Sequence, residues 1–186
     1  MIHQVLPFIA KELNTFFKLK YGVDEDLVVV SGLVDMHGNA PTEEENKILL
    51  SVINIEEEKL NRARATYVPA GESGGFSKRA PAIKINLQVM FTANFAQGNY
   101  LEGLKLISGV IGFFQRQRTY DGKNYPTLDD SIEKLSFEIT SLDVHKLNQL
   151  WGTVGNKYQP SVIYKVKTLE IQEDTVGREV TEISGF

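Results

Sequence analysis

Cysteine is absent from the 186 residues of the sequence. Its absence excludes disulfide bonds, thiolate zinc sites and cysteine nucleophiles, and it fits a chain that folds in a reducing cytosol. No apolar run in the sequence approaches the length of about 18 residues that a membrane-spanning helix needs. The first residues also lack the positive start, the apolar block and the cleavage site of a signal peptide. We therefore expect a soluble protein with no membrane partner.

Clusters of basic residues are also missing. Twenty Lys and Arg residues stand against twenty-four Asp and Glu, which gives a formal net charge of -4. No stretch could neutralise a line of phosphates, so nucleic acid is not an expected partner. The length suffices for one sizeable core. We predict one domain, residues 1–171, followed by a polar C-terminal extension, residues 172–186, that could add as a strand to a neighbouring chain.

Two long segments carry apolar residues at the spacing of an amphipathic helix. The first runs from Ile2 to Lys20, and Gly22 is placed to close its last turn. The second covers residues 100–118, and its apolar stripe consists of Leu101, Leu104, Ile107, Val110, Ile111 and Phe114. Three glycines lie within it: Gly103, Gly109 and Gly112. Each costs about 1 kcal/mol of helix stability relative to Ala, so they indicate close approach of another backbone.

Strand patterns occupy most of the remaining chain. They cover Leu27–Val34, Lys47–Glu57, Ile83–Phe95, Ile132–Thr140 and a last strand from Ser161, whose register changes between Val166 and Leu169 as in a bulge. Lys47–Glu57 is apolar on both sides, which predicts a central strand. Ile83–Phe95 alternates, which predicts one buried face and one that is wet or waits for a partner. Residues 60–78 contain the glycine-rich stretch GESGG and are expected to form a flexible loop. Because GESGG lacks the spacing of a P-loop, we do not expect it to bind phosphate.

The helices are too few for a doubly wound parallel sheet. We therefore predict an α+β fold, with a mostly antiparallel or mixed β-sheet and flanking α-helices.

The side chains that could support catalysis are not arranged for it. The carboxylates form two runs, Glu43–Glu45 and Glu56–Glu58. Consecutive strand residues point to opposite faces, whereas an acid/base pair needs groups that converge on one cleft. The three histidines, His3, His37 and His145, have no metal-ligand spacing. Ser161 follows a proline and is not in a G-x-S-x-G turn. We expect no enzyme activity and no cofactor.

An aromatic corner lies between the last helix and the last strand, in the sequence LWGTVGNKYQPSVIYKV. Ser141 or Asp143 can cap the short helix that leads into it, and glycines end that helix. We expect Gly152, Gly155 and Pro160 to lock the corner, with Trp151 as an inner anchor.

Lys157 and Tyr158 would then point outward from this corner. Interfaces favour aromatic residues and disfavour exposed charge, and the polar side of Ile83–Phe95 is poor in charge. Filling of the core is the alternative for the aromatic residues: we favour it for Trp151, and both interpretations stay open for Tyr158 and Tyr164. The candidate contact residues are Asn86, Gln88, Trp151, Lys157, Tyr158, Pro160 and Tyr164.

Four segments together resemble a known family. They are SVINIEEEKLNR, APAIKINLQVMFTANF, YLEGLKLISGVIGFFQ and LSFEITSLDVHKLNQLWGTVGNKYQPSVIYKV. The sequence is similar to the Pvc16-type family, the tube-terminating caps of extracellular contractile injection systems, which resemble phage tail terminators in role. The resemblance extends to about Ile171.

The resemblance implies a tail-terminator-like α+β cap. It further implies a hexameric ring that ends the inner tube and anchors the sheath, with the tube and sheath proteins as partners. Such a part would assemble in the bacterial cytoplasm and then belong to the released particle. Two other classes remain open: an assembly chaperone or binding module of the same fold, and a metal-dependent hydrolase that uses Glu56 or Glu57.

Overall fold

The computed structural model describes residues 2–35, 37–58, 66–70, 75–79, 83–155 and 157–171. Its helices are α1 (Ile2–Tyr21), α2 (Tyr100–Arg116) and α3 (Val144–Val154), with short 3₁₀ turns η1 (Thr42–Glu44) and η4 (Gln97–Asn99). The strands are β1 (Val28–Val30), β2 (Lys47–Glu57), β3 (Thr66–Ala70), β4 (Gly75–Arg79), β5 (Ile83–Asn94), β6 (Thr119–Asp121), β7 (Lys134–Thr140) and β8 (Ser161–Ile171).

Six strands form one mixed sheet in the order β1-β2-β5-β8-β7-β6. β1 runs parallel to β2, and the other neighbours are antiparallel. The α+β prediction is confirmed. β2 is buried on both faces in its first half alone. It was expected to be central, but it lies second in the sheet, and beyond Leu50 it has no neighbour on its outer side among the described strands, because β1 ends there. The centre of the sheet is formed by β5 and β8.

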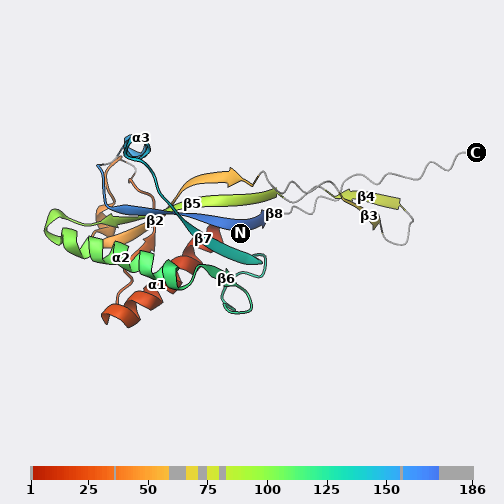
Figure 1. The fold of residues 1–186 in the computed structure, drawn as a ribbon, viewed down its shortest axis with the longest axis horizontal. Helices are drawn as coiled ribbons and strands as arrows, with labels where there is room; N and C mark the ends of the chain where they lie inside the picture. Colours follow the sequence, from red (N-terminus) through yellow and green to blue (C-terminus); the bar gives the residue numbers. More distant parts are fainter. Residues whose placement is uncertain are drawn as a thin grey trace, which may run out of the picture.

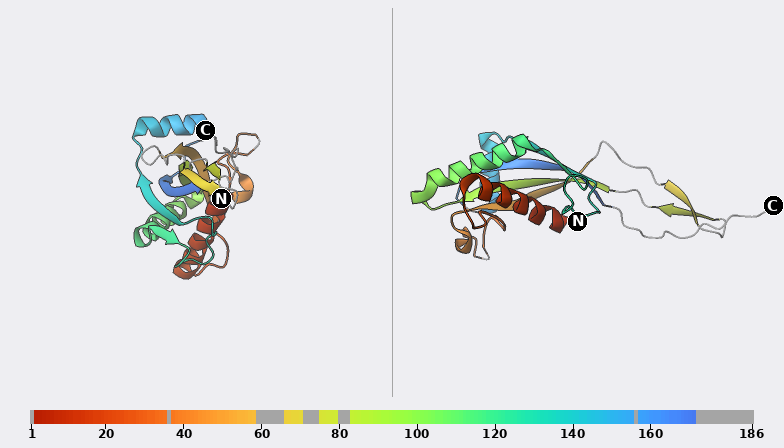
Figure 2. Two further views of the ribbon diagram at one scale, coloured as in Figure 1. Left: turned by 90° about the vertical axis from the view of Figure 1, so that its right-hand side faces the viewer. Right: turned by 90° about the horizontal axis from the view of Figure 1, so that it is seen from below.

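The helices cover the two faces of the sheet unequally (Figure 1). α1 and α2 lie side by side on one face, as the view from below in Figure 2 shows, and the main core lies between them and the sheet. Aromatic rings fill its centre: the ring centroids of Phe114 and Phe137 are 4.5 Å apart, and those of Phe114 and Tyr164 4.6 Å. α3 lies on the opposite face over a smaller cluster that contains Met90, Trp151 and Ile163.

Two of the three glycines in α2 allow close packing, against side chains and not against a backbone as expected. A Cβ on Gly109 would lie 2.7 Å from Cε1 of Phe17, and one on Gly103 would lie 3.1 Å from the Phe95 ring. A Cβ on Gly112 would meet nothing within 4 Å. The helix is also rotated from the expected stripe, since Leu101 is 79% exposed.

The last strand contains the expected bulge. Leu87 lies opposite Val166 and Ile85 opposite Leu169, so three residue steps on β8 match two on β5. The segment expected to be a flexible loop contains β3 and β4, which pair with each other as a separate two-stranded sheet. Residues 71–74 and the C-terminal extension, residues 172–186, lie outside the described residues. Among the helices that the structure describes, none has the length and apolar character needed to cross a bilayer.

Candidate assembly interface

The helix that leads into the aromatic corner has well-defined ends. Asp143 is its N-cap, and its Oδ1 accepts a hydrogen bond from the backbone N–H of Lys146 at 2.8 Å. This backbone hydrogen bond lowers the pKa of the Asp143 carboxyl below its usual value, because it stabilises the ionised form. At the other end Gly155 adopts a left-handed conformation with φ of 76° and donates its N–H to the Trp151 carbonyl at 3.1 Å. Gly152 lies inside the helix and does not end it.

Trp151 is the inner anchor of the corner, as expected. Its side chain is 4% exposed and packs with Met90 and Ile163 of the sheet. Its indole Nε1 is buried and has no hydrogen-bond partner among the described residues. Tyr158 meets the Trp151 ring edge to face, with centroids 5.9 Å apart and planes at 70°. Because Tyr158 is itself 61% exposed, it presents the outer side of this aromatic pair to solvent.

Hydrogen bonds fasten the corner to the end of β5. The carbonyl of Pro160 accepts from the N–H of Ala93 at 2.9 Å. The Gln159 side chain donates to Oδ1 of Asn94 at 3.1 Å. Lys157 is exposed beside Tyr158. The corner therefore holds a fixed position on the sheet and turns two of the seven candidate contact residues outward.

The polar side of β5 is largely buried, which corrects the expected wet face. Asn86 is 2% exposed and donates to a carboxylate oxygen of Glu58 at 2.8 Å. Asn94 is 6% exposed, and its amide donates to the carbonyls of Pro41, the N-cap of η1, and Glu44, its last residue. Thr92 is buried as well. Short polar side chains are thus used here to bind chain segments that lie on the sheet, and Asn86 offers no free contact surface in the single chain.

Gln88 belongs to a polar network on the same face. Its side chain donates to Oε1 of Glu56, and Oε2 of Glu56 accepts from Nζ of Lys165 at 3.3 Å. The Glu56 carboxylate, a candidate metal ligand by sequence, is therefore held by side chains of two neighbouring strands. No group of three His, Asp or Glu residues that could hold a metal ion occurs within the described ranges.

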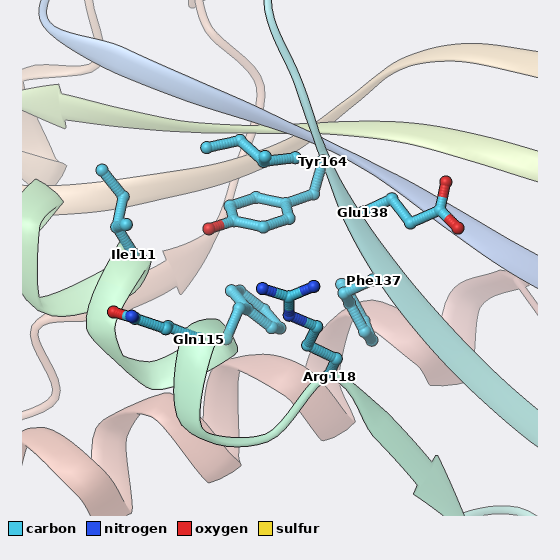
Figure 3. A pocket seen from close by; sticks show the side chains of 8 residues that line it. Ile111, Gln115, Arg118, Phe137, Glu138 and Tyr164 are labelled. Atoms are coloured by element: carbon cyan, nitrogen blue, oxygen red, sulfur yellow. The ribbon is translucent and has the colours of Figure 1, made fainter.

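Tyr164 lies on the opposite face and lines a groove of about 360 Å³ between α2 and the end of β7 (Figure 3). The groove is lined by Ile111, Phe114, Gln115, Arg118, Phe137, Glu138, Ile139 and Tyr164. Tyr164 is 3% exposed, and burial raises the pKa of its phenol while the positive charge of Arg118 opposes this shift. The phenol is therefore un-ionised at neutral pH, and Figure 3 shows its oxygen directed into the groove toward Ile111.

The groove combines apolar walls with one uncompensated cation. Ile139 is 56% exposed and Ile111 39% exposed. Glu138 is paired with Lys167 at 2.6 Å, and no carboxylate among the described residues forms an ion pair with Arg118. Sequence reasoning missed this site. The spacing of apolar residues gives no sign of it, because the exposure of Ile139 and Arg118 depends on where β6 begins beside β7.

Comparisons with known proteins agree with the fold. The family model described as the Pvc16 N-terminal domain matches residues 4–183. A sheath/tube terminator of an extracellular contractile injection system, PVC, in its extended state, is similar in structure with a TM-score of 0.55 at 14% identity. The tube-terminating cap of the anti-feeding prophage, AFP, is similar with a TM-score of 0.55 at 13% identity.

The similarity covers 96% of this chain in both cases, but 61% of the PVC chain and 58% of the AFP chain. This chain thus spans about three fifths of the length of these structures. No curated protein matches the sequence.

Proposed function

Because the chain belongs to the Pvc16 N-terminal domain family, we propose that it is a structural cap that terminates the inner tube of a contractile injection system. The observation that carries the proposal is the family match over residues 4–183, nearly the whole chain. The fold similarity to two tube terminators supports it. In this role the protein acts by shape and contact and not by catalysis.

The proposal has a physical basis in the assembly problem. A tube of stacked rings exposes unpaired surface at its growing end, and a head-to-tail contact that does not close continues without limit. A cap must match the tube on one side and offer no matching surface on the other. We propose that copies of this chain form a closed ring, a hexamer, which sits on the last tube ring and holds the end of the sheath. Permanent interfaces of this kind typically bury about 2,000 Å² or more.

The outer side of the aromatic corner is our candidate for a contact with the tube or sheath. Lys157 and Tyr158 are exposed there, on a corner whose position is fixed by Trp151 and Pro160. A rigid aromatic side chain loses little conformational entropy on binding, which suits it to a permanent contact. The assembly would take place in the bacterial cytoplasm, before release of the particle.

The test is electron microscopy of particles assembled with and without this protein. Without it we expect tubes and sheaths of uncontrolled length, and normal length should return when the chain is supplied in trans. Particles of normal length in its absence would contradict the proposal. An assembly chaperone would be absent from the purified particle, so detection of the chain at the tube end distinguishes the two roles.

A further inference from the structure

The groove between α2 and the end of β7 contains polar groups without partners. The Tyr164 side chain is 3% exposed, and its hydroxyl points into the groove and forms no hydrogen bond with another described residue (Figure 3). Arg118 and Gln115 line the same groove, and neither side chain has a hydrogen bond or an ion pair within the described part of the chain. A buried polar group without a partner is costly, so the groove is suited to bind a ligand.

The lining of the groove specifies the chemistry of that ligand. The un-ionised phenol of Tyr164 can donate a hydrogen bond, as the guanidinium and the amide beside it can. Glu138, the carboxylate in the lining, is already paired with Lys167. Ile111 and Ile139 add exposed apolar surface. Because a carboxylate is the acceptor that such donors prefer, the groove matches an acidic side chain with an aliphatic one next to it.

The sequence offers such a pair in the C-terminal extension. Residues 172–186 read QEDTVGREVTEISGF and carry four acidic residues against one arginine. In this segment Glu182 is followed directly by Ile183. Another stretch outside the described residues, residues 59–65, reads KLNRARA and is basic, so it would be repelled by Arg118. The family match runs to residue 183 and thus includes the acidic and aliphatic pair.

We infer that the C-terminal extension folds back on its own chain and docks in this groove, with Glu182 on Arg118 and Tyr164. Ile183 then packs against the apolar wall that Ile111 and Ile139 form. In this arrangement the segment covers Ile139, which is 56% exposed without it. The inference goes beyond the cap function and does not depend on it.

The extension is long enough for this contact. β8 ends at Ile171, and Tyr164 lies seven residues earlier on the same strand, which is about 23 Å at the rise of a strand. Glu182 follows Ile171 by eleven residues, and an extended chain of that length spans about 36 Å. The difference leaves length for a turn and for the chain to pass β7 and β6, which lie on that side of β8.

Weak binding is enough to hold a segment that is tethered in this way. A short flexible tether gives its end an effective concentration of about 1 mM, so a dissociation constant well below that value keeps the groove occupied. The apolar contact supplies most of the affinity. The ion pair with the exposed Arg118 mainly determines which residues meet.

The test is a cross-link within the purified chain, which has no cysteine of its own. Gln115→Cys/Ser184→Cys places one thiol at the groove and one beside Ile183, and a short bismaleimide joins thiols that lie close together. At low protein concentration we expect an internal link, seen as a monomer band of altered mobility. Val144→Cys/Ser184→Cys is the matched control, because Val144 is 73% exposed on α3, which lies on the opposite face of the sheet. Its internal link should form several-fold more slowly.

A charge exchange tests which residues meet. In the Gln115→Cys/Ser184→Cys chain, Arg118→Glu and Glu182→Arg should each slow the internal link to the rate of the control, and the two changes together should restore it. Glu173→Arg makes the same charge change within the extension. Glu173 lies two residues after the end of β8, too close to it to reach the groove, so this variant should link at the original rate.

Two results would overturn the inference. Equal rates of internal linking from positions 115 and 144 would show that the extension does not dock in the groove. Links between chains in place of internal links would show that the groove takes the extension of a second copy. Neither result bears on the cap function, which is tested separately by the length of tubes in particles.

Discussion

At the scale of single residues, Trp151 decides how α3 is held. Leu147, Leu150 and Val154 of that helix are partly exposed and Val144 is exposed, so Trp151 is the one buried apolar residue of α3. Trp151→Ala should lower the free energy of unfolding by about 3 to 5 kcal/mol, because it leaves a large cavity. Denaturant unfolding followed by circular dichroism measures the loss.

Trp151→Phe is the matched variant for this prediction. It keeps most of the ring and removes the buried Nε1–H, which has no partner among the described residues, so its cost should be much smaller. A loss equal to that of Trp151→Ala would show that ring volume is not what holds the helix.

Asp143 makes the same helix sensitive to acid. Its pKa in the folded protein is lowered by the backbone N–H of Lys146, so the carboxylate stabilises the folded state at pH values above its ordinary pKa of about 3.9. This contribution is lost as the pH falls through the lowered, folded-state pKa. The emission of Trp151, the one tryptophan of the sequence, should shift to the red over that range.

Asp143→Asn retains a side-chain oxygen for the cap but does not titrate. Its Trp151 emission should therefore stay constant over the interval in which that of the original chain changes. An identical acid transition in both proteins would assign the change to other carboxylates.

At the scale of elements, the contact between α1 and α2 depends on one glycine. A Cβ on Gly109 would lie 2.7 Å from Cε1 of Phe17 and 2.8 Å from Oη of Tyr21, and Phe17 is fully buried and cannot move aside. Gly109→Ala should therefore lower the free energy of unfolding by about 1 to 3 kcal/mol, as overpacking does. Thermal unfolding of the purified chain provides the measurement.

Gly112→Ala in the same helix should have the opposite sign. Its Cβ meets nothing within 4 Å, so the gain in helix propensity of about 0.5 to 1 kcal/mol should appear undiminished. If both variants changed stability in the same direction, the difference in packing would not be the cause.

The spacing of apolar residues predicted most elements of this fold, but it did not predict which polar side chains are buried. The bounds of β2, β5 and α2 followed from apolar spacing, and the bulge in β8 followed from its change of register. The alternation in β5 did not reveal that Asn86 and Asn94 are buried, because their hydrogen-bond partners come from segments distant in the sequence. In the corner, Trp151 lies inward and Tyr158 outward as predicted, although Gly155 alone ends the helix and Gly152 lies within it. The groove beside β7 could not be foreseen, since it depends on the length of β6.

At the scale of the whole molecule, the outer side of the corner should matter for assembly and not for folding. Tyr158→Ala removes an exposed ring and should change the free energy of unfolding little, by about 0.5 kcal/mol or less. It should reduce the amount of the chain in purified particles, which quantitative blotting against the tube protein measures. Normal incorporation of Tyr158→Ala would remove this surface from the proposed interface.

The closed edge of β1 matters at the scale of the whole molecule, because an open strand edge can pair with a second copy. Val28 is 2% exposed, and both of its backbone groups are bonded by Asn14. Asn14→Leu would leave them without partners at a cost of about 1 to 3 kcal/mol, and it would also open a further edge to strand addition.

We expect the purified Asn14→Leu chain to be less stable and to form open-ended aggregates, as light scattering would show. Thr15→Leu, next to it on an exposed position of α1, is the control for added apolar surface. If Asn14→Leu lost stability but scattered light no more than Thr15→Leu, the asparagine would serve the fold alone. An increase confined to Asn14→Leu would mean that this amide also limits which edges of the sheet a second copy can use.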